Sequence, residues 1–242
     1  MPNELTTRAK KLLARGGPVG AIARLSAVTN PTSAVFDIGV NRGTIGRHLI
    51  RIFPEAPAYF VEPLPQQVAY LRDRFSEFSN LTVVEQAFSD IPGIAEFYVG
   101  DAVGTSSLLA PLPDSQASLH AENRVADMIS VNVNTLDQFC SDAGIDHISC
   151  MKIDAQGSED KIFLGASDML ANHKIDIIMF EWFAVPHYEN SPLLLDLWNR
   201  LSSFGYDMFD IFPGRKFQNG QRRFGDAVFV SDTFRRDAIS QL

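Results

Sequence analysis

A glycine-rich segment follows the first strand-like run of the sequence and has the composition of a ligand-binding turn. The apolar run 34–36 leads into Asp37, and Gly39, Asn41 and Gly43 follow before a helical pattern begins. Glycines there let the backbone turn tightly and let a ligand approach the amino end of the helix. The spacing differs from the Gly-x-Gly-x-x-Gly turn of dinucleotide sites, and the Asp37 carboxylate would repel a pyrophosphate. The segment favours a nucleotide-type ligand with a cationic amino group, such as S-adenosylmethionine; a turn whose glycines serve only packing is the alternative.

A second acidic residue ends the next strand-like run. Residues 59–61 lead into Glu62 and Pro63, and Glu62 follows Gly43 by 19 positions. A carboxylate at that place can accept hydrogen bonds from both ribose hydroxyls of an adenosine, for which the expected separation is about 20 residues. The expected contacts to the adenine are Pro63, Leu64, Ala87 and Phe88. The two segments together predict one adenosine site, whereas a glutamate alone at a strand end is often only a solvated terminus.

Alternating strand and helix patterns must position these residues. From residue 34 to about residue 205, apolar runs of strand length alternate with helical patterns. This order predicts an α/β fold with a doubly wound, mainly parallel sheet and helices on both faces. The last strand candidates, 206–212 and 226–232, are joined by a loop, which predicts an antiparallel last strand. Two further candidates, 95–100 and 129–136, predict a β insertion on this sheet.

The composition is that of a folded chain with an acidic balance. The 242 residues are 45% apolar and 21% charged, and 21 basic against 29 acidic residues give a net charge of −8. That charge argues against a general affinity for nucleic acid, because such binding neutralises phosphates. No run approaches the roughly 20 apolar residues of a membrane span, so we expect a cytoplasmic protein without stable membrane insertion. The two cysteines match neither a disulfide scaffold nor a zinc site, and the composition leaves the oligomeric state open.

Two segments of this acidic chain carry positive charge. Residues 1–30 hold five basic residues and one acid, and we interpret them as a helical appendage that covers the ligand cleft, ahead of a domain over residues 31–242. A flexible solubilising tail is the alternative. The segment 213–225 holds four cations and no acid, and long loops are often functional. It predicts a clamp for a phosphate or carboxylate on the second substrate, with a solvated face as the alternative.

Six short motifs occur in an order that resembles the FkbM-type methyltransferase family. They are Asp37-x-Gly39-x-Asn41-x-Gly43, Glu62-Pro63, Ala87-x-Ser89-Asp90, Ser106-Ser107-Leu108, Thr135-Leu136-Asp137 and the block from Lys152 to Glu159. The resemblance extends over residues 34–231. It implies a Rossmann-like sheet of the class I methyltransferase type, S-adenosylmethionine binding with a contribution from Ser107, and methyl transfer to a hydroxyl oxygen. The family often has a carboxylate where this chain has Gln156.

Four residues are candidates for the chemistry itself. Lys152 and Asp154 end a strand-like run at the carboxyl edge of the expected sheet, and residues two apart on a strand point to the same side. Asp154 can then reach the methionyl amino group or the acceptor, unless the pair only closes the strand. Glu181 ends the following strand, and His187 lies six residues further on. Either can be the base for a hydroxyl proton during in-line methyl transfer, and we expect no metal because the acids lack a diagnostic ligand spacing.

Two other functions fit parts of the pattern. An adenosine-binding module without turnover fits Asp37 and Glu62 equally well, because both residues indicate only binding. A nicotinamide-dependent dehydrogenase shares the acid at the strand end but requires the closer glycine spacing. The leading interpretation is a methyltransferase that moves a methyl group from S-adenosylmethionine to a hydroxyl of a small-molecule or glycosidic acceptor.

Overall fold

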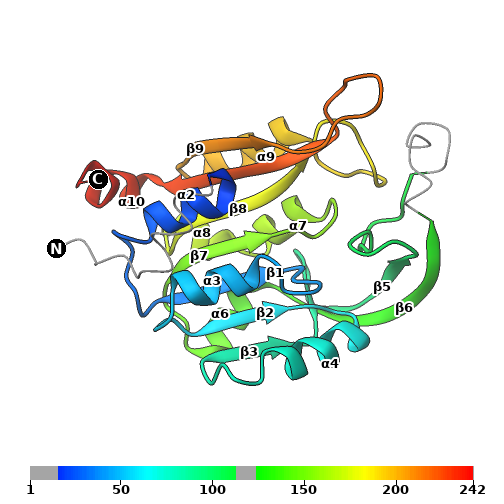
Figure 1. Ribbon diagram of the computed structural model, residues 1–242, viewed down its shortest axis with the longest axis horizontal. Coiled ribbons are helices and arrows are strands. Elements are labelled where there is room, and N and C mark those ends of the chain that lie inside the picture. The colour runs from blue at the N-terminus through cyan, green and yellow to red at the C-terminus, as the bar shows by residue number, and fades with distance from the viewer. Residues whose placement is uncertain (1–15, 113–123, 242) are drawn as a thin grey trace.

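The computed structural model describes residues 16–112 and 124–241, which form two β-sheets. The larger sheet has seven strands in the order β3-β2-β1-β7-β8-β10-β9 (Figure 1). They are β1 Ala34–Ile38, β2 Ala58–Val61, β3 Leu81–Val84, β7 Ile148–Ile153, β8 Ile175–Phe183, β9 Tyr206–Pro213 and β10 Phe224–Ser231. Neighbouring strands from β3 to β8 are parallel, whereas β10 runs antiparallel to β8 and β9. The predicted parallel sheet with an antiparallel last strand is confirmed.

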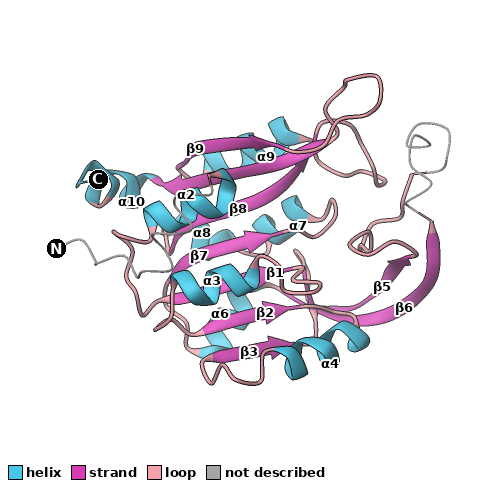
Figure 2. Cartoon of the chain, in the orientation of Figure 1, coloured by secondary structure: helices cyan, strands magenta, loops and turns pink. Residues whose placement is uncertain are grey.

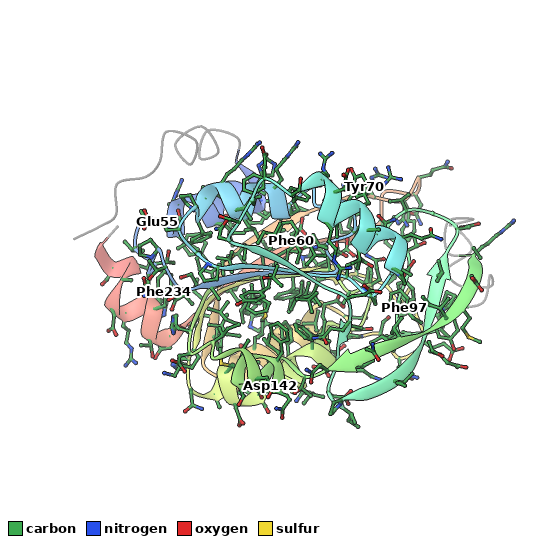
Figure 3. The ribbon with its side chains drawn as sticks, turned by 90° about the horizontal axis from the view of Figure 1, so that it is seen from below. Glu55, Phe60, Tyr70, Phe97, Asp142 and Phe234 are labelled. Atoms are coloured by element: carbon green, nitrogen blue, oxygen red, sulfur yellow. The ribbon has the colours of Figure 1, made fainter. Side chains whose placement is uncertain are left out.

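Helices cover both faces of this sheet. One face carries α2 Gly17–Leu25, α3 Gly46–Ile52, α4 Pro65–Arg74 and α10 Asp232–Asp237, which a short 3-10 helix, Ile239–Gln241, follows. The other face carries α6 Leu136–Ala143, α7 Glu159–Leu164, α8 Ser167–Ala171 and α9 Leu194–Ser203. In Figure 3, Tyr70 of α4 and Asp142 of α6 lie on opposite sides of the sheet. Figure 2 shows the same layers by secondary structure.

The two helical layers explain why the central strands are apolar along almost their whole length. Every residue of β1 and β7 is buried, including Asp37 and Lys152. A strand that is covered on both faces reads as a continuous apolar run and not as an alternating one. The ring of Phe36 on β1 stacks on that of Tyr59, with 4.8 Å between centroids. The two charged residues in these strands must therefore find partners inside the protein.

The parallel strands end at one edge of the sheet, on the right in Figure 1. From β1 the chain moves outward to β2 and β3, and it returns on the other side of β1 for β7. Such a reversal of strand order opens a crevice outside the carboxyl ends of the strands. Ile38 pairs with Val61 on one side and with Ile153 on the other. The segments that follow β1, β2 and β7 therefore begin side by side.

The β insertion forms a sheet of its own, which corrects the expectation that it adds to the main sheet. Its strands are β4 Ala87–Phe88, β5 Gly93–Gly100 and β6 Val125–Asn134, in the order β4-β6-β5. Phe97 packs on Val131 and Val133 on one face, whereas Ile94 is 76% exposed on the other. One apolar face suffices for an antiparallel ribbon that covers a cavity, so the ribbon needs no place in the main sheet. We call this sheet of β4, β5 and β6 the arm. In Figure 1 it lies beyond the carboxyl edge of the main sheet.

The segment before residue 31 contributes to the core through α2. Ile22 and Leu25 are 0% exposed, and the helix contacts β8, β9 and β10. The expected boundary at residue 30 therefore separates no independent unit among the described residues, and α2 covers the face of the sheet and not the cleft. Residues 1–15, the first half of the expected appendage, lie outside the described residues. None of the described helices has both the length and the apolar character that a membrane crossing requires.

The Thr-Leu-Asp motif links two helices, α6 and α8, and its Thr135 and Leu136 begin α6 although 129–136 was expected to be a strand. Thr135 caps α6, since its hydroxyl accepts a hydrogen bond from the Gln138 amide at 3.1 Å. Asp137 reaches the start of α8, where its carboxylate accepts from the amides of Asp168 at 2.8 Å and Met169 at 3.0 Å. The free N–H groups of a helix start need such acceptors. The motif therefore joins α6 to α8 and serves the fold.

Replacement of Asp137 by Ala tests this structural assignment. We expect D137A to lower the free energy of unfolding by about 1–2 kcal/mol, because two amides at the start of α8 lose their acceptor. Urea denaturation measures the change. Asp142, which is exposed on α6 and accepts from Gln138, provides the control D142A, for which we expect a smaller effect. Equal losses in the two variants would contradict the bridging role of Asp137.

Candidate functional site

A cavity of about 470 Å³ lies between the carboxyl edge of the main sheet and the arm. Its volume is within the range of small-molecule and cofactor sites. The sheet side contributes Gly39, Asn41, Glu62, Pro63, Leu64, Asp154 and Gln156. The arm contributes Ala87, Phe88, Phe97, Val99, Asp127 and Ile129. Most of the sequence-predicted cofactor residues thus meet around one space, with two acids on the side of the main sheet and a mainly apolar side on the arm.

The glycine turn has a backbone that only permissive residues adopt easily. Gly39 and Gly43 have φ of +70° and +72°, and Asn41 between them has φ of +50°. A Cβ on Gly39 would overlap the main-chain oxygen of Asp154, and one on Gly43 would lie 2.5 Å from the Phe75 ring. Both glycines are therefore required by packing as well as by turn geometry. The close approach of Gly39 to Asp154 brings the ends of β1 and β7 together at the cavity.

Asp37 lies behind the cavity wall and has a cationic partner within the protein. Its carboxylate is 2.9 Å from the Lys152 ammonium, which also donates to the Gly39 carbonyl at 3.0 Å and lies 3.7 Å from the Asp154 carboxylate. Burial raises the pKa of Asp37, and Lys152 partly offsets this effect. Burial alone would lower the pKa of Lys152, but Asp37 and Asp154 outweigh it, so the pKa is raised and the ammonium stays charged. Asp37 and Lys152 support the turn and line no part of the cavity.

Glu62 lines the cavity at the end of β2. Its carboxylate accepts from the amide of Asn41 at 2.9 Å and from that of Leu64 at 3.1 Å, and the residue is 5% exposed. Burial raises the pKa of Glu62, and the two amides partly offset the effect. Each carboxylate oxygen has a second acceptor position. Glu62 therefore holds the glycine turn and can still accept hydrogen bonds from a ligand, beside the apolar walls of Pro63, Ala87 and Phe88.

Acidic side chains gather at the ends of β7, β8 and β10. Asp154 lines the cavity, and the Gln156 amide donates to Asp154 and to Glu181, each at 2.8 Å. Asp226 on β10 pairs directly with Glu181 across the strands. Burial raises the pKa of Glu181, and the neighbouring charges of Asp154 and others add to it; burial also raises the pKa of Asp226 to about 6. A carboxylate with a raised pKa is suited to proton transfer near neutral pH.

Several predicted site residues line no part of the cavity, among them Ser107, Glu181 and His187. Ser107 is 1% exposed, and its hydroxyl donates to the main-chain oxygen of Gln156 at 2.8 Å; its neighbour Ser106 lines the cavity in its place. His187 is buried, its Nδ1 lies 2.7 Å from the Val185 oxygen, and its ring stacks on Phe183. Glu181 likewise contributes no surface to the cavity and reaches it through Gln156. Within the described ranges, no group of three or more His, Cys, Asp or Glu side chains is placed to hold a metal ion.

Glu159 is a buried acid that orders the loop after β7. It is 1% exposed, and its carboxylate accepts from the Ala155 amide at 2.9 Å. The sequence predicts an acid at the amino end of the following helix, where the helix dipole favours it, and Glu159 is the first residue of α7. Burial raises its pKa to about 7, and the main-chain amides of the loop only partly offset this. The loop that presents Asp154 and Gln156 is therefore built around a carboxyl group that ionises near neutral pH.

The arrangement defines a class of protein. A doubly wound sheet with an antiparallel last strand, a glycine turn after β1 and a carboxylate after β2 is the arrangement expected of a Rossmann-like methyltransferase. The chain belongs to the family described as the methyltransferase FkbM domain, whose profile matches residues 37–208. This membership confirms the resemblance of the six motifs, and it identifies S-adenosylmethionine as the cofactor.

Comparisons with individual proteins found further similarities. The chain is 28% identical over 185 residues to the 2-O-methyltransferase NoeI of Sinorhizobium fredii, a match that spans 74% of this chain and 75% of the relative. Among solved structures, it is similar to a precorrin-6y C5,15-methyltransferase from Geobacter metallireducens, with 13% identity, a TM-score of 0.46 and 94% of each chain covered. It is also similar to Aeropyrum pernix fibrillarin with bound S-adenosylmethionine, with 13% identity, a TM-score of 0.43, and 92% and 73% of the two chains covered.

The raised pKa of Glu159 gives a test in the free protein. An acid whose pKa is higher in the folded than in the unfolded state stabilises the fold at low pH, and this contribution is lost as the pH rises from the ordinary 4.5 to about 7. We expect E159Q, which cannot ionise, to match the original protein near pH 4.5. Above pH 7 it should be more stable, by on the order of 3 kcal/mol.

Urea denaturation across this pH range measures the difference between the two proteins. The matched control is E77Q at an exposed glutamate, for which we expect little effect on stability because the side chain has no buried contacts to lose. A constant difference for E159Q would show that Glu159 ionises in the folded protein as it does in the unfolded chain.

Proposed function

We propose that this methyltransferase transfers the methyl group of S-adenosylmethionine to a hydroxyl oxygen of a small-molecule or glycosidic acceptor, and not to nucleic acid. The observation that carries the proposal is the cavity itself, with Glu62 at the end of β2 and Asp154 at the end of β7 on its polar side. One carboxylate suits the ribose of the cofactor, and the other suits an acceptor hydroxyl. The 2-O-methyltransferase NoeI among its relatives supports an oxygen acceptor. The net charge of −8 disfavours nucleic acid.

The residues present fit the cofactor. Glu62 accepts the ribose hydroxyls, Pro63, Ala87 and Phe88 form the apolar site for the adenine, and the turn at Gly39 and Asn41 passes beside the methionyl part. These residues all line one cavity. The bound cofactor supplies an electrophilic methyl group on a sulfonium ion. Asp37 is paired with Lys152 behind the cavity wall. Asp154 is therefore the acid that remains to contact the methionyl amino group or the acceptor.

Asp154 is also the best placed base. In an in-line displacement the acceptor oxygen forms a bond to the methyl carbon while the bond from carbon to sulfur breaks, and the hydroxyl proton passes to a base. Asp154 lines the cavity, whereas Glu181 lies behind Gln156. His187 faces the Val185 oxygen and Phe183, so we assign it no direct role. Lys152 stays protonated and cannot serve as a base, so it acts by holding Asp154.

The variant E62Q tests the adenosine placement and the activity together. Because the amide keeps the shape of the carboxylate but loses its charge, we expect a fall of about tenfold or more in affinity for S-adenosylmethionine. Calorimetry measures it. The control E85Q replaces the glutamate directly after β3, which is exposed and pairs with Arg72, and should bind normally. Unchanged affinity in E62Q would place the adenosine elsewhere.

Turnover separates this function from a binding module. Incubation of the protein with S-adenosylmethionine carrying a labelled methyl group and a panel of sugars and small alcohols should transfer the label to oxygen. Label that stays on the cofactor with every acceptor, while calorimetry shows binding, would favour the module without turnover. The family membership assigns the chain to the methyltransferases and not to the nicotinamide-dependent dehydrogenases.

The hairpin between β9 and β10 supports an acceptor with an anionic group. Ala184, just beyond β8, donates its amide to the Arg223 oxygen, which places the hairpin next to the end of β8. The guanidinium of Arg223 lies 5.5 Å from the Phe217 ring centroid, and Arg222 donates to the Gly214 oxygen. The hairpin is therefore ordered. Its exposed cations are Arg215 and Lys216.

The double variant R215Q/K216Q tests this surface. We expect its KM for a phosphorylated sugar to rise about threefold to tenfold at low salt and less at high salt, because screening weakens the lost attraction. The same sugar without phosphate should be unaffected. K174Q removes an exposed lysine just before β8, at the opposite edge of the sheet, and is the control. Equal KM values for both sugars in the double variant would show that the hairpin is a solvated face and does not bind the acceptor.

A further inference from the structure

Gln156 is the centre of a hydrogen-bond network at the wall of the cavity. Its amide nitrogen lies 2.8 Å from Asp154 Oδ1 and 2.8 Å from Glu181 Oε2. Its side-chain oxygen accepts from the hydroxyl of Tyr188 at 3.0 Å. An amide group has two N–H donors and one carbonyl acceptor. Both donors of Gln156 are therefore given to carboxylates that come from two different strand ends.

The network fixes which way the amide points. The reversed orientation would bring the amide oxygen against two carboxylate oxygens and would leave both N–H groups facing the Tyr188 hydroxyl. Burial foremost, with the nearby acids, raises the pKa of Tyr188, so the phenol stays protonated and donates. Its single proton is shared between the Gln156 side-chain oxygen and the Thr105 main-chain oxygen, which also lies 3.0 Å away. Tyr188 thus holds the oxygen end of the amide and leaves the nitrogen end for the carboxylates.

The backbone at Gln156 is held in an unusual conformation that serves this orientation. Gln156 has φ of +51° and Gly157 has φ of +93°, and a left-handed conformation is uncommon for a residue with a side chain. The Ser107 hydroxyl donates to the Gln156 main-chain oxygen at 2.8 Å. Such backbone strain persists where the surrounding contacts determine it, and it clusters at functional sites. The buried Ser107 thereby acquires a role that the motif alone did not reveal.

We propose that Gln156 is a positioning residue for proton removal, which holds Asp154 toward the cavity and ties it to Glu181 through one amide. The inference rests on the proposed function. Hydrogen bonds donated to carboxylates favour their ionised form, so the amide keeps the pair able to accept a proton. When the acceptor oxygen gains the methyl group, its proton passes to a free oxygen of this pair and then to solvent.

The charges that face the pair make the amide necessary. Glu181 lies opposite Asp226 on β10, and Glu159 on α7 lies near both carboxylates, so like charges surround it. Lys152 on β7 is the opposing cation, 3.7 Å from Asp154. Like charges at short range disfavour ionisation. Without the two N–H donors, the pair would hold its protons to a higher pH and would be a poor base at neutral pH.

Two substitutions separate charge from position. Q156E keeps the side-chain shape, removes both donors and adds a third carboxylate. Q156N keeps an amide on a residue that tolerates a left-handed backbone, but it is too short to bridge both acids. The control Q138E removes a matching bond, the 2.7 Å donation from Gln138 to Asp142 on the exposed face of α6. Thermal unfolding and calorimetry with S-adenosylmethionine first establish that each variant is folded and binds the cofactor.

The readout is the protonation of the carboxyl groups, followed in two ways. Infrared spectroscopy of the protein without cofactor follows the carbonyl band of protonated carboxyl groups against pH, and the pH profile of kcat follows the reaction. We expect Q156E to move both transitions upward by about one pH unit or more, so that kcat near pH 7 falls about tenfold and recovers at higher pH. Q156N should shift them less, and Q138E should match the original protein.

The outcomes distinguish this inference from the proposed function. Unchanged infrared transitions in Q156E and Q156N would overturn the positioning role, whatever the activity. A loss of kcat that is the same at every pH would also overturn it, because it would indicate a purely structural effect. Suppose that the infrared transitions shift but the protein methylates no hydroxyl. This result would support the positioning of Asp154 and Glu181 by Gln156, and it would refute the proposal that the acceptor atom is an oxygen.

Discussion

The ammonium group of Lys152 is the constraint on which the site depends. It lies inside the sheet between β1 and β7, where an unpaired charge would be costly, and it is balanced by Asp37, the Gly39 oxygen and Asp154. The same contacts fix the first residue of the glycine turn and the acid at the end of β7. Loss of Lys152 would leave two carboxylates without their cation. The main role of the ion pair is therefore to position the glycine turn and Asp154, and its net contribution to stability is secondary.

Each wall of the cavity is built by a different kind of interaction. Buried charge and hydrogen bonds hold the sheet side, where Glu62 binds the Asn41 amide and Gln156 joins Asp154 to Glu181. Apolar packing contributes to the arm side, where Phe97 packs on Val131 and Val133. A polar side that orients ligand groups and an apolar side that excludes water are what a cofactor reaction requires.

The sequence predicted the fold well because each element carries its own signal. Continuous apolar runs gave the buried parallel strands, and glycines and strand-end acids located the cavity. It did less well wherever a partner lies far along the chain. Asp37 was expected to contact a ligand, but its carboxylate forms an ion pair with Lys152. Lys152 also donates to the oxygen of Gly39, which is 113 positions away in the sequence. Ser106 lines the cavity and its neighbour Ser107 does not, and the motif that contains both does not distinguish them. The helix α6 is marked in the sequence only by its cap at Thr135.

The wide separation of β1 and β7 in sequence also bears on the order of assembly. Glu62 and Asn41 are 21 positions apart and can meet early, since a short loop closes at little entropic expense. The ammonium that completes the turn arrives only after the intervening helices and the arm have been made. Non-local pairing of this kind slows folding. A nascent chain that ends before β7 would hold the turn and Glu62 without the lysine, so cofactor affinity would develop late in synthesis.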